Sequence, residues 1–163
     1  MIPALMLAAA LVAPDVPSDA ITPGVDNPGV TQATIGQTIC VHNWTKSVRP
    51  PASYTNALKA KQLKALGYAD QDPSHYEEDH RESLEVGGDP RDPANLYPEP
   101  YSPASGYGAR VKDKLETASG RAICSGTITL EQGRAILKGN WIDAFHRYCG
   151  PTPSATCRVS SAP

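Results

Sequence analysis

Three polar residues near the middle of the chain have the types that metal-assisted hydrolysis of a phosphodiester requires. Asp79 and His80 are adjacent, and Asn95 follows after a turn-rich stretch. A carboxylate oxygen can hold a hard divalent cation, and a histidine, whose pKa lies near neutrality, can activate water as a general base. An asparagine can fix the orientation and the tautomer of that histidine. We therefore predict that Asp79 binds a metal ion, that His80 is the general base and that Asn95 supports His80.

The segment 76–100 must fold so that these residues meet. It is polar throughout and rich in turn-forming residues. Adjacent residues of a regular strand point to opposite faces, so Asp79 and His80 can converge only where a strand ends in a loop. The glycines and proline of 85–90 predict a reversal of the chain at this point. A hairpin-like return then brings Asn95 back beside His80.

The order of these residues resembles the signature of bacterial HNH endonuclease domains, which is Asp-His, then Gly-Gly, then Asn-Leu-Trp-Pro. The corresponding segments are Asp79-His80, Leu84-Glu85-Val86-Gly87-Gly88 and Asn95-Leu96-Tyr97-Pro98. The match covers about residues 76–100, and a weaker likeness extends over TICVHNW, SYTNALK, VKDKLE and Cys124-Ser125-Gly126.

The chain departs from that signature in three ways. Arg81-Glu82-Ser83 stands where the family has apolar residues and proline, and Tyr97 stands where tryptophan is commoner. The second metal-binding histidine, which the family has shortly after the asparagine, is absent at that spacing.

The resemblance implies a ββα-metal fold, in which two strands and a helix enclose a cation. It also implies that the acid before the histidine binds the metal, that the histidine activates water and that the asparagine supports it. The fold class that we expect is α+β, with a small HNH-like ββα-metal core, additional helices and an N-terminal strand.

The helix expected over 108–119 offers replacements for the missing histidine. At 100° per residue its apolar residues fall on one side and Lys112, Asp113 and Glu116 on the other. We expect Asp113, ahead of Glu116, to be the second metal ligand, and Lys112 and Arg110 to bind the substrate phosphate. The alternative is an ordinary solvated face with a Lys112–Glu116 pair at i,i+4.

The remaining elements follow from periodicity. Alternating β-formers predict a strand over 34–44, and apolar spacing predicts helices over 55–67 and 129–148. Thr129 and Gln132 form a capping-box pattern at the start of the last helix. Residues 68–104 show no obvious regular structure.

The 163 residues fit one domain with flanking segments. We expect a signal peptide over 1–20, a flexible leader over 21–33, the nuclease domain over 34–150 and a tail over 151–163. The apolar run near the N-terminus ends in small residues suited to cleavage, although no Lys or Arg precedes it. At about 12 residues it is shorter than the roughly 20 that span a bilayer.

Export would make the four cysteines candidates for disulfide bonds. Four cysteines allow three pairings, among which the sequence alone does not decide. The short spacing of Cys149 and Cys157 favours their pairing, which leaves Cys40 with Cys124. A zinc site is the alternative, but no Cys-x-x-Cys or histidine cluster accompanies the cysteines.

The net charge of −2 provides no global attraction for a polyanion, so a nucleic-acid partner needs a local basic face. We expect a secreted monomer that is not associated with a membrane after removal of the signal peptide. Its expected partner and substrate is nucleic acid, DNA ahead of RNA. The expected cofactor is a divalent metal, Mg²⁺ ahead of Mn²⁺ or Ca²⁺. Two alternatives stay open: a catalytically inactive secreted binding module with the same fold, and a structural or toxin-like protein whose acidic loop binds only Ca²⁺.

Overall fold

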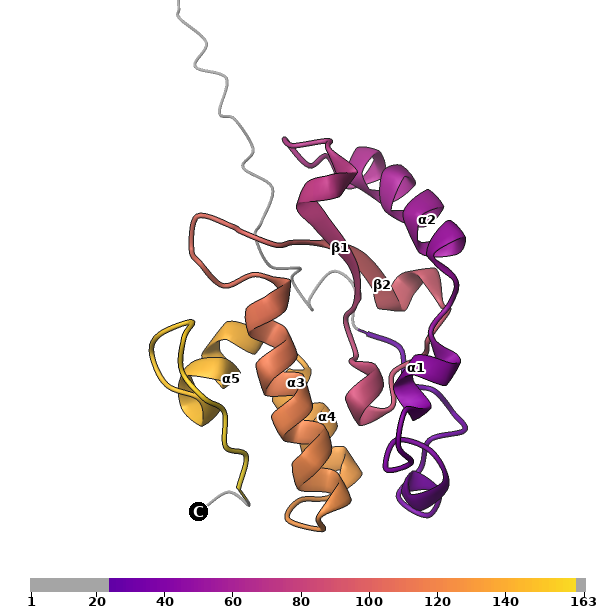
Figure 1. Ribbon diagram of the computed structural model, residues 1–163, viewed down its shortest axis with the longest axis vertical. Coiled ribbons are helices and arrows are strands. Elements are labelled where there is room, and N and C mark those ends of the chain that lie inside the picture. The colour runs from indigo at the N-terminus through magenta and orange to yellow at the C-terminus, as the bar shows by residue number, and fades with distance from the viewer. Residues whose placement is uncertain (1–23, 161–163) are drawn as a thin grey trace, which may run out of the picture.

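The computed structural model describes residues 24–160 (Figure 1). A two-stranded sheet and five α-helices make this part of the protein an α+β structure. Its helices and strands are α1 (Trp44–Val48), α2 (Ala52–Ala65), β1 (Tyr76–His80), β2 (Leu96–Pro100), α3 (Ala109–Cys124), α4 (Leu130–Leu137) and α5 (Trp141–Tyr148), with short 3₁₀ helices at Ile35–Gln37, Pro73–His75, Leu84–Val86 and Pro93–Asn95.

The two strands form an antiparallel hairpin within the segment for which the sequence predicted no regular structure. The register runs from Tyr76 opposite Pro100 to His80 opposite Leu96. The reversal predicted from the Gly-Gly pair is therefore confirmed. It is long because two of the 3₁₀ turns lie between the strands.

Alternation along the strands divides their side chains between two helices. Asp79 is paired in register with Tyr97 and so shares its face; Lys112 of α3 contacts this face. The opposite face adjoins α2, where Lys59 donates to the carbonyl of Tyr76. Figure 1 shows α2 and α3 on different sides of the hairpin. An isolated two-stranded hairpin is marginally stable in water, so these helices supply its support.

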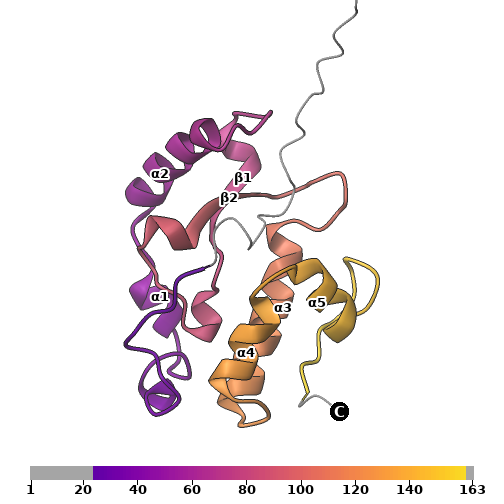
Figure 2. The same ribbon diagram turned by 180° about the vertical axis from the view of Figure 1, so that it is seen from behind.

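The apolar core lies between α3, α4 and α5 rather than beside the sheet. Leu115 and Ile123 of α3 are buried together with Leu137 and Phe145. Figure 2 shows α4 and α5 stacked against α3. Helix α3 continues to Cys124, beyond the predicted end at 119, because this core covers its last turns.

The predicted N-terminal strand over 34–44 is wrong. The segment is a series of tight turns around the 3₁₀ helix Ile35–Gln37, and α1 begins at Trp44. Its backbone hydrogen bonds are local, for example from Gln37 N to the carbonyl of Thr34. Alternating β-formers fold as a strand only where a partner strand is available. In this segment the backbone groups form local turns instead.

The single helix predicted over 129–148 is two helices. Gly139 lies between them with a left-handed φ of 90°, which glycine adopts readily. Asn140 then caps α5 by accepting a hydrogen bond from Ile142 N. The capping box of Thr129 and Gln132 at the start of α4 is confirmed.

Residues 24–33, expected as part of a flexible leader, are held against the loop between the strands. Asn27 N donates to the carbonyl of Gly87, and Val30 is buried in the core. The folded domain therefore begins before residue 34. The expected signal peptide lies outside the described residues, and within 24–160 no helix is long and apolar enough to cross a membrane.

Both favoured disulfides are present, Cys40–Cys124 and Cys149–Cys157. The first joins the N-terminal turns to the end of α3. The second fastens the segment after α5 back onto that helix, so the predicted tail is attached over its first residues.

The two disulfides differ strongly in the loop that they close. Cys40–Cys124 spans 84 residues and Cys149–Cys157 spans 8. In the chain-entropy model these loops correspond to about 4.6 and about 2.5 kcal/mol. We expect the variant Cys40→Ser/Cys124→Ser to lose more free energy of unfolding than Cys149→Ser/Cys157→Ser. Denaturant titration of both variants measures the difference, and equal losses would contradict the loop-length argument.

Candidate functional site

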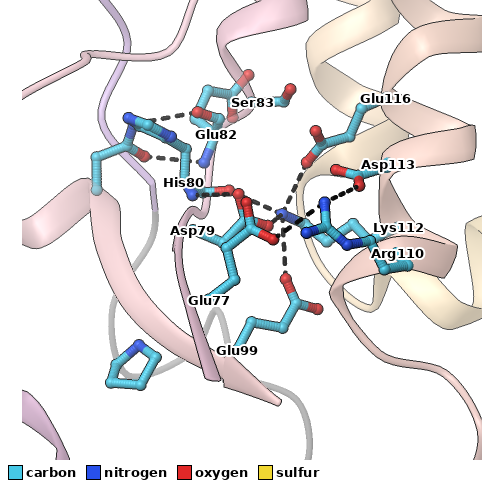
Figure 3. Close-up of polar contacts among 12 residues, drawn as sticks. Glu77, Asp79, His80, Glu82, Ser83, Glu99, Arg110, Lys112, Asp113 and Glu116 are labelled. Atoms are coloured by element: carbon cyan, nitrogen blue, oxygen red, sulfur yellow. Dashed lines mark hydrogen bonds and ion pairs between the residues drawn. The ribbon is translucent and has the colours of Figure 1, made fainter. Parts of the chain in front are cut away.

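A buried ammonium group lies at the centre of the predicted site. Lys112 Nζ is 2.7 Å from Asp79 Oδ2, 2.8 Å from Glu116 Oε1 and 3.6 Å from Glu99 Oε2. It also donates to the carbonyl of His80 at 2.8 Å. Figure 3 shows the three carboxylates converging on this amine from different elements. All of these side chains are buried, Lys112 with 2% of its surface exposed.

Regular geometry of the helix and the hairpin produces this arrangement. Lys112 and Glu116 are neighbours on α3 because they are four residues apart. Asp79 and Glu99 lie on one face of the hairpin, since Asp79 pairs with Tyr97 and Glu99 follows two residues later. The ring of Tyr97 completes the enclosure, with its centroid 5.7 Å from the amine.

Burial and charge act in opposite directions on these groups. Burial raises the pKa of Glu99 well above its usual range, which favours the neutral form of this carboxyl. Burial also raises the pKa of Glu116 to about 7. Burial raises the pKa of Asp79 too, but the charge of Lys112 and the hydrogen bonds from Glu99 and Lys112 together outweigh it and lower this pKa below its usual range. Burial lowers the pKa of Lys112, whereas Asp79 and Glu116 outweigh that effect and hold it well above normal. Asp79 and Lys112 therefore form a charged pair.

His80 is neutral and has a defined tautomer. Its Nε2 is 3.2 Å from the carbonyl oxygen of Pro90. Because a carbonyl oxygen only accepts, Nε2 carries the proton and Nδ1 keeps its lone pair. Burial lowers the pKa of His80, although Asp79 partly opposes this. At neutral pH the ring is thus an unprotonated base, as the predicted role requires.

Asn95 is placed beside the loop rather than on the histidine ring. Its Oδ1 accepts hydrogen bonds from Val25 N and Glu82 N, and its Nδ2 donates to the carbonyls of Glu82 and Asp89. Within the described residues Asn95 makes no hydrogen bond to the His80 ring, so its predicted support of His80 can act only through the backbone. Asn95 holds the backbone next to Pro90, whose carbonyl in turn orients His80, so it is a positioning residue.

The close approach of this loop explains one of its glycines. A Cβ at Gly88 would lie 1.8 Å from the carbonyl oxygen of Glu82 and 3.0 Å from Asn95 Nδ2. Any side chain at this position would push the two backbones apart. The Gly-Gly turn is thus part of the packing around Asn95.

The two helix carboxylates predicted as metal ligands lie in different surroundings. Glu116 reaches the cluster around Lys112, whereas Asp113 lies at its rim and contacts Arg110 Nη1 at 3.4 Å. Arg110 also lies 3.5 Å from Glu77 and remains largely exposed. The prediction that Lys112 binds substrate is wrong because the amine is enclosed by carboxylates. Arg110 is at the surface, where a phosphate can reach it.

The chemistry of the donor set fits a hard cation. Asp79 and Glu116 offer carboxylate oxygens, and Mg²⁺ commonly takes one or two such ligands and keeps several waters. Glu99 is fully buried, and neither of its oxygens accepts a hydrogen bond. The amine of Lys112 occupies the space between these carboxylates as a resident cation. As the side chains stand, no three His, Cys, Asp or Glu residues within 24–160 are grouped to share a metal ion.

The sequence prediction missed Glu99 and Pro90. Glu99 had a signal, because the two-residue period of a strand places it on the same face as Tyr97 and Asp79. Pro90 acts through its backbone carbonyl, which no side-chain pattern reveals.

Comparison of the chain with protein-family models, curated proteins and solved structures finds no match. Function is therefore inferred from the geometry and chemistry of the site itself.

Removal of the central amine tests the charge cluster. In Lys112→Met, buried Asp79 loses its cation, and breaking a buried ion pair from one side costs about 3–5 kcal/mol. Lys64→Met is the matched control, since Lys64 is exposed on α2 and such changes usually stay within about 0.5 kcal/mol. Urea titration of both variants measures the two losses. Similar small losses would show that Lys112 is not structurally required.

Because the side chain of Asn95 joins separate stretches of backbone, even the nearly isosteric change Asn95→Asp should lower the free energy of unfolding. Asn95→Asp removes the two donors that satisfy the carbonyls of Glu82 and Asp89, and unsatisfied buried groups cost about 1–3 kcal/mol each. Asn140→Asp is the control, because aspartate caps a helix as well as asparagine does. We expect a loss of free energy of unfolding in the first variant and almost none in the second. Equal stability of the two would contradict the assigned contacts.

Proposed function

We propose that this protein is a secreted, metal-dependent endonuclease that hydrolyses phosphodiester bonds of nucleic acid, in a ββα-metal site of the HNH type. The observation that carries the proposal is the state of His80. It is a neutral imidazole with Nε2–H held on the Pro90 carbonyl, beside a carboxylate, Asp79, that remains ionised. A general base needs this combination of free lone pair, fixed ring and suitable pKa.

The proton movement follows from the tautomer. Nδ1 of His80 accepts a proton from the attacking water, while Nε2–H stays on the carbonyl of Pro90. The imidazolium that forms is stabilised by Asp79, whose charge favours the protonated ring. Arg110 is exposed at the rim, and its guanidinium would bind the phosphate.

Asp79 and Glu116 are the residues that would hold the metal. A bound divalent cation supplies Lewis-acid polarisation of the phosphate and stabilises charge on the leaving oxygen. Lys112 keeps the same carboxylates together by its own charge and so preserves the site between rounds of metal binding.

Secretion is supported by the two disulfides, which form and persist in oxidising compartments. An exported enzyme of this kind is suited to degrade extracellular nucleic acid.

One observation favours the alternative of an inactive secreted binding module. Lys112 neutralises Asp79 at 2.7 Å, so a metal must compete with a resident ammonium. The two functions differ in their response to metal, because a cation that binds the native state raises its stability. A melting temperature unchanged by Mg²⁺ and Mn²⁺ would favour the inactive module.

The test of the proposed function is cleavage of plasmid DNA with Mg²⁺ or Mn²⁺, and its loss in chelator. His80→Ala should slow cleavage by about 10²–10⁴-fold, the usual contribution of a general base. His42→Ala is the matched control, since His42 is exposed in the N-terminal turns, and it should cleave at the wild-type rate. Equal cleavage by His80→Ala and wild type would overturn the assignment.

A further inference from the structure

A groove of about 820 Å³ runs between the outer side of α3 and the C-terminal segment 154–159. Three exposed cationic side chains line it, Lys114, Arg121 and Arg158, against one acid, Asp113. None of the three cations has a salt-bridge partner within the described part of the chain. The groove therefore carries a local positive charge on a protein whose net charge is −2.

The remaining polar groups of the groove suit phosphate oxygens. Neutral hydroxyl groups are common partners of nucleic-acid backbones, together with Lys and Arg. The hydroxyl side chains that line it are Thr117, Ser125, Thr127, Ser154 and Thr156.

The wall opposite α3 is held in place by several contacts. The disulfide Cys149–Cys157 anchors the segment, and Arg158 N donates to the carbonyl of Tyr148. Lys114 Nζ donates to the carbonyl of Pro153 at 2.7 Å. The groove is thus formed in the free protein, which lowers the ordering cost of binding.

Helix α3 borders both the groove and the candidate site. Successive residues of α3 turn by 100°, so Lys112 faces the carboxylate cluster while Asp113 and Lys114 line the groove. Asp113 contacts Arg110, which contacts Glu77 of β1. Figure 3 shows Asp113 and Arg110 beside the buried cluster. Lys114 and Arg121 lie two turns apart, about 10 Å along the helix.

We propose that this groove binds the sugar–phosphate backbone of the nucleic acid and leads it to the site at His80. The inference rests on the proposed function for its substrate class. Its own support is the charge complementarity of Lys114, Arg121 and Arg158 to a polyanion. The lysines of α2 do not line this groove.

The test is binding of a labelled DNA duplex in chelator, where cleavage is suppressed. The groove variant is Lys114→Gln/Arg121→Gln/Arg158→Gln. The control is Lys46→Gln/Lys61→Gln/Lys64→Gln, which changes the net charge equally at exposed positions outside the groove. Fluorescence anisotropy gives the affinity over a range of salt concentrations, and thermal melts verify that both variants fold.

Each lost phosphate contact should reduce the slope of log affinity against log salt by about 0.9. We expect the groove variant to bind more weakly and with a slope lower by about 2.7, and the control to keep the wild-type slope. Equal slopes for the groove variant and wild type, or absence of duplex binding by wild type, would overturn the proposal.

Plasmid cleavage by the same proteins separates this proposal from the proposed function. Cleavage by wild type with unchanged binding by the groove variant would refute the groove and leave the nuclease assignment standing. If the groove variant has a lower slope of log affinity against log salt but the wild type does not cleave plasmid, the groove proposal is supported and the catalytic assignment is refuted.

Discussion

The ion pair between Lys112 and Asp79 is the interaction on which the candidate site depends. A buried charge is costly unless it is paired and hydrogen-bonded, and one face of the hairpin presents acidic side chains to the interior. The amine of Lys112 makes that face compatible with α3, since it contacts Asp79, Glu99 and the carbonyl of His80 together. The contacts that hold α3 on the hairpin are therefore the same contacts that assemble the site.

A second constraint is the backbone arrangement around Asn95. Its amide joins three stretches of chain, near Val25, Glu82 and Asp89, through four hydrogen bonds. The carbonyl that orients His80 belongs to Pro90, which follows Asp89 directly. The orientation of the histidine thus depends on packing of the N-terminal segment against the loop, because Val25 hydrogen-bonds to both Asn95 and Asp89.

Patterns that depend on neighbours in the sequence were predictable, whereas those that depend on tertiary pairing were not. The reversal at Gly88, the capping box at Thr129 and the favoured disulfides follow from local chemistry or spacing. The burial of Lys112 does not, because a lysine opposite an apolar stripe is ordinarily solvated. Its partners Asp79 and Glu99 come from strands that only the hairpin register brings together. The inward position of Glu116 was not predictable for the same reason, because the position of the hairpin relative to α3 decides which carboxylate turns inward.

Helix α3 separates inward-facing acids from outward-facing cations in a protein with an excess of acidic residues. The acids of the candidate site are turned inward, where the ammonium of Lys112 limits their negative field. The cations of the outer face, Lys114 and Arg121, remain exposed and form no salt bridge within residues 24–160. Because screening confines the effect of each charge to about 8–10 Å in physiological salt, an approaching phosphate responds to this local face rather than to the net charge. The two 100° steps from Lys112 to Lys114 thus separate a neutralised interior from a positively charged exterior.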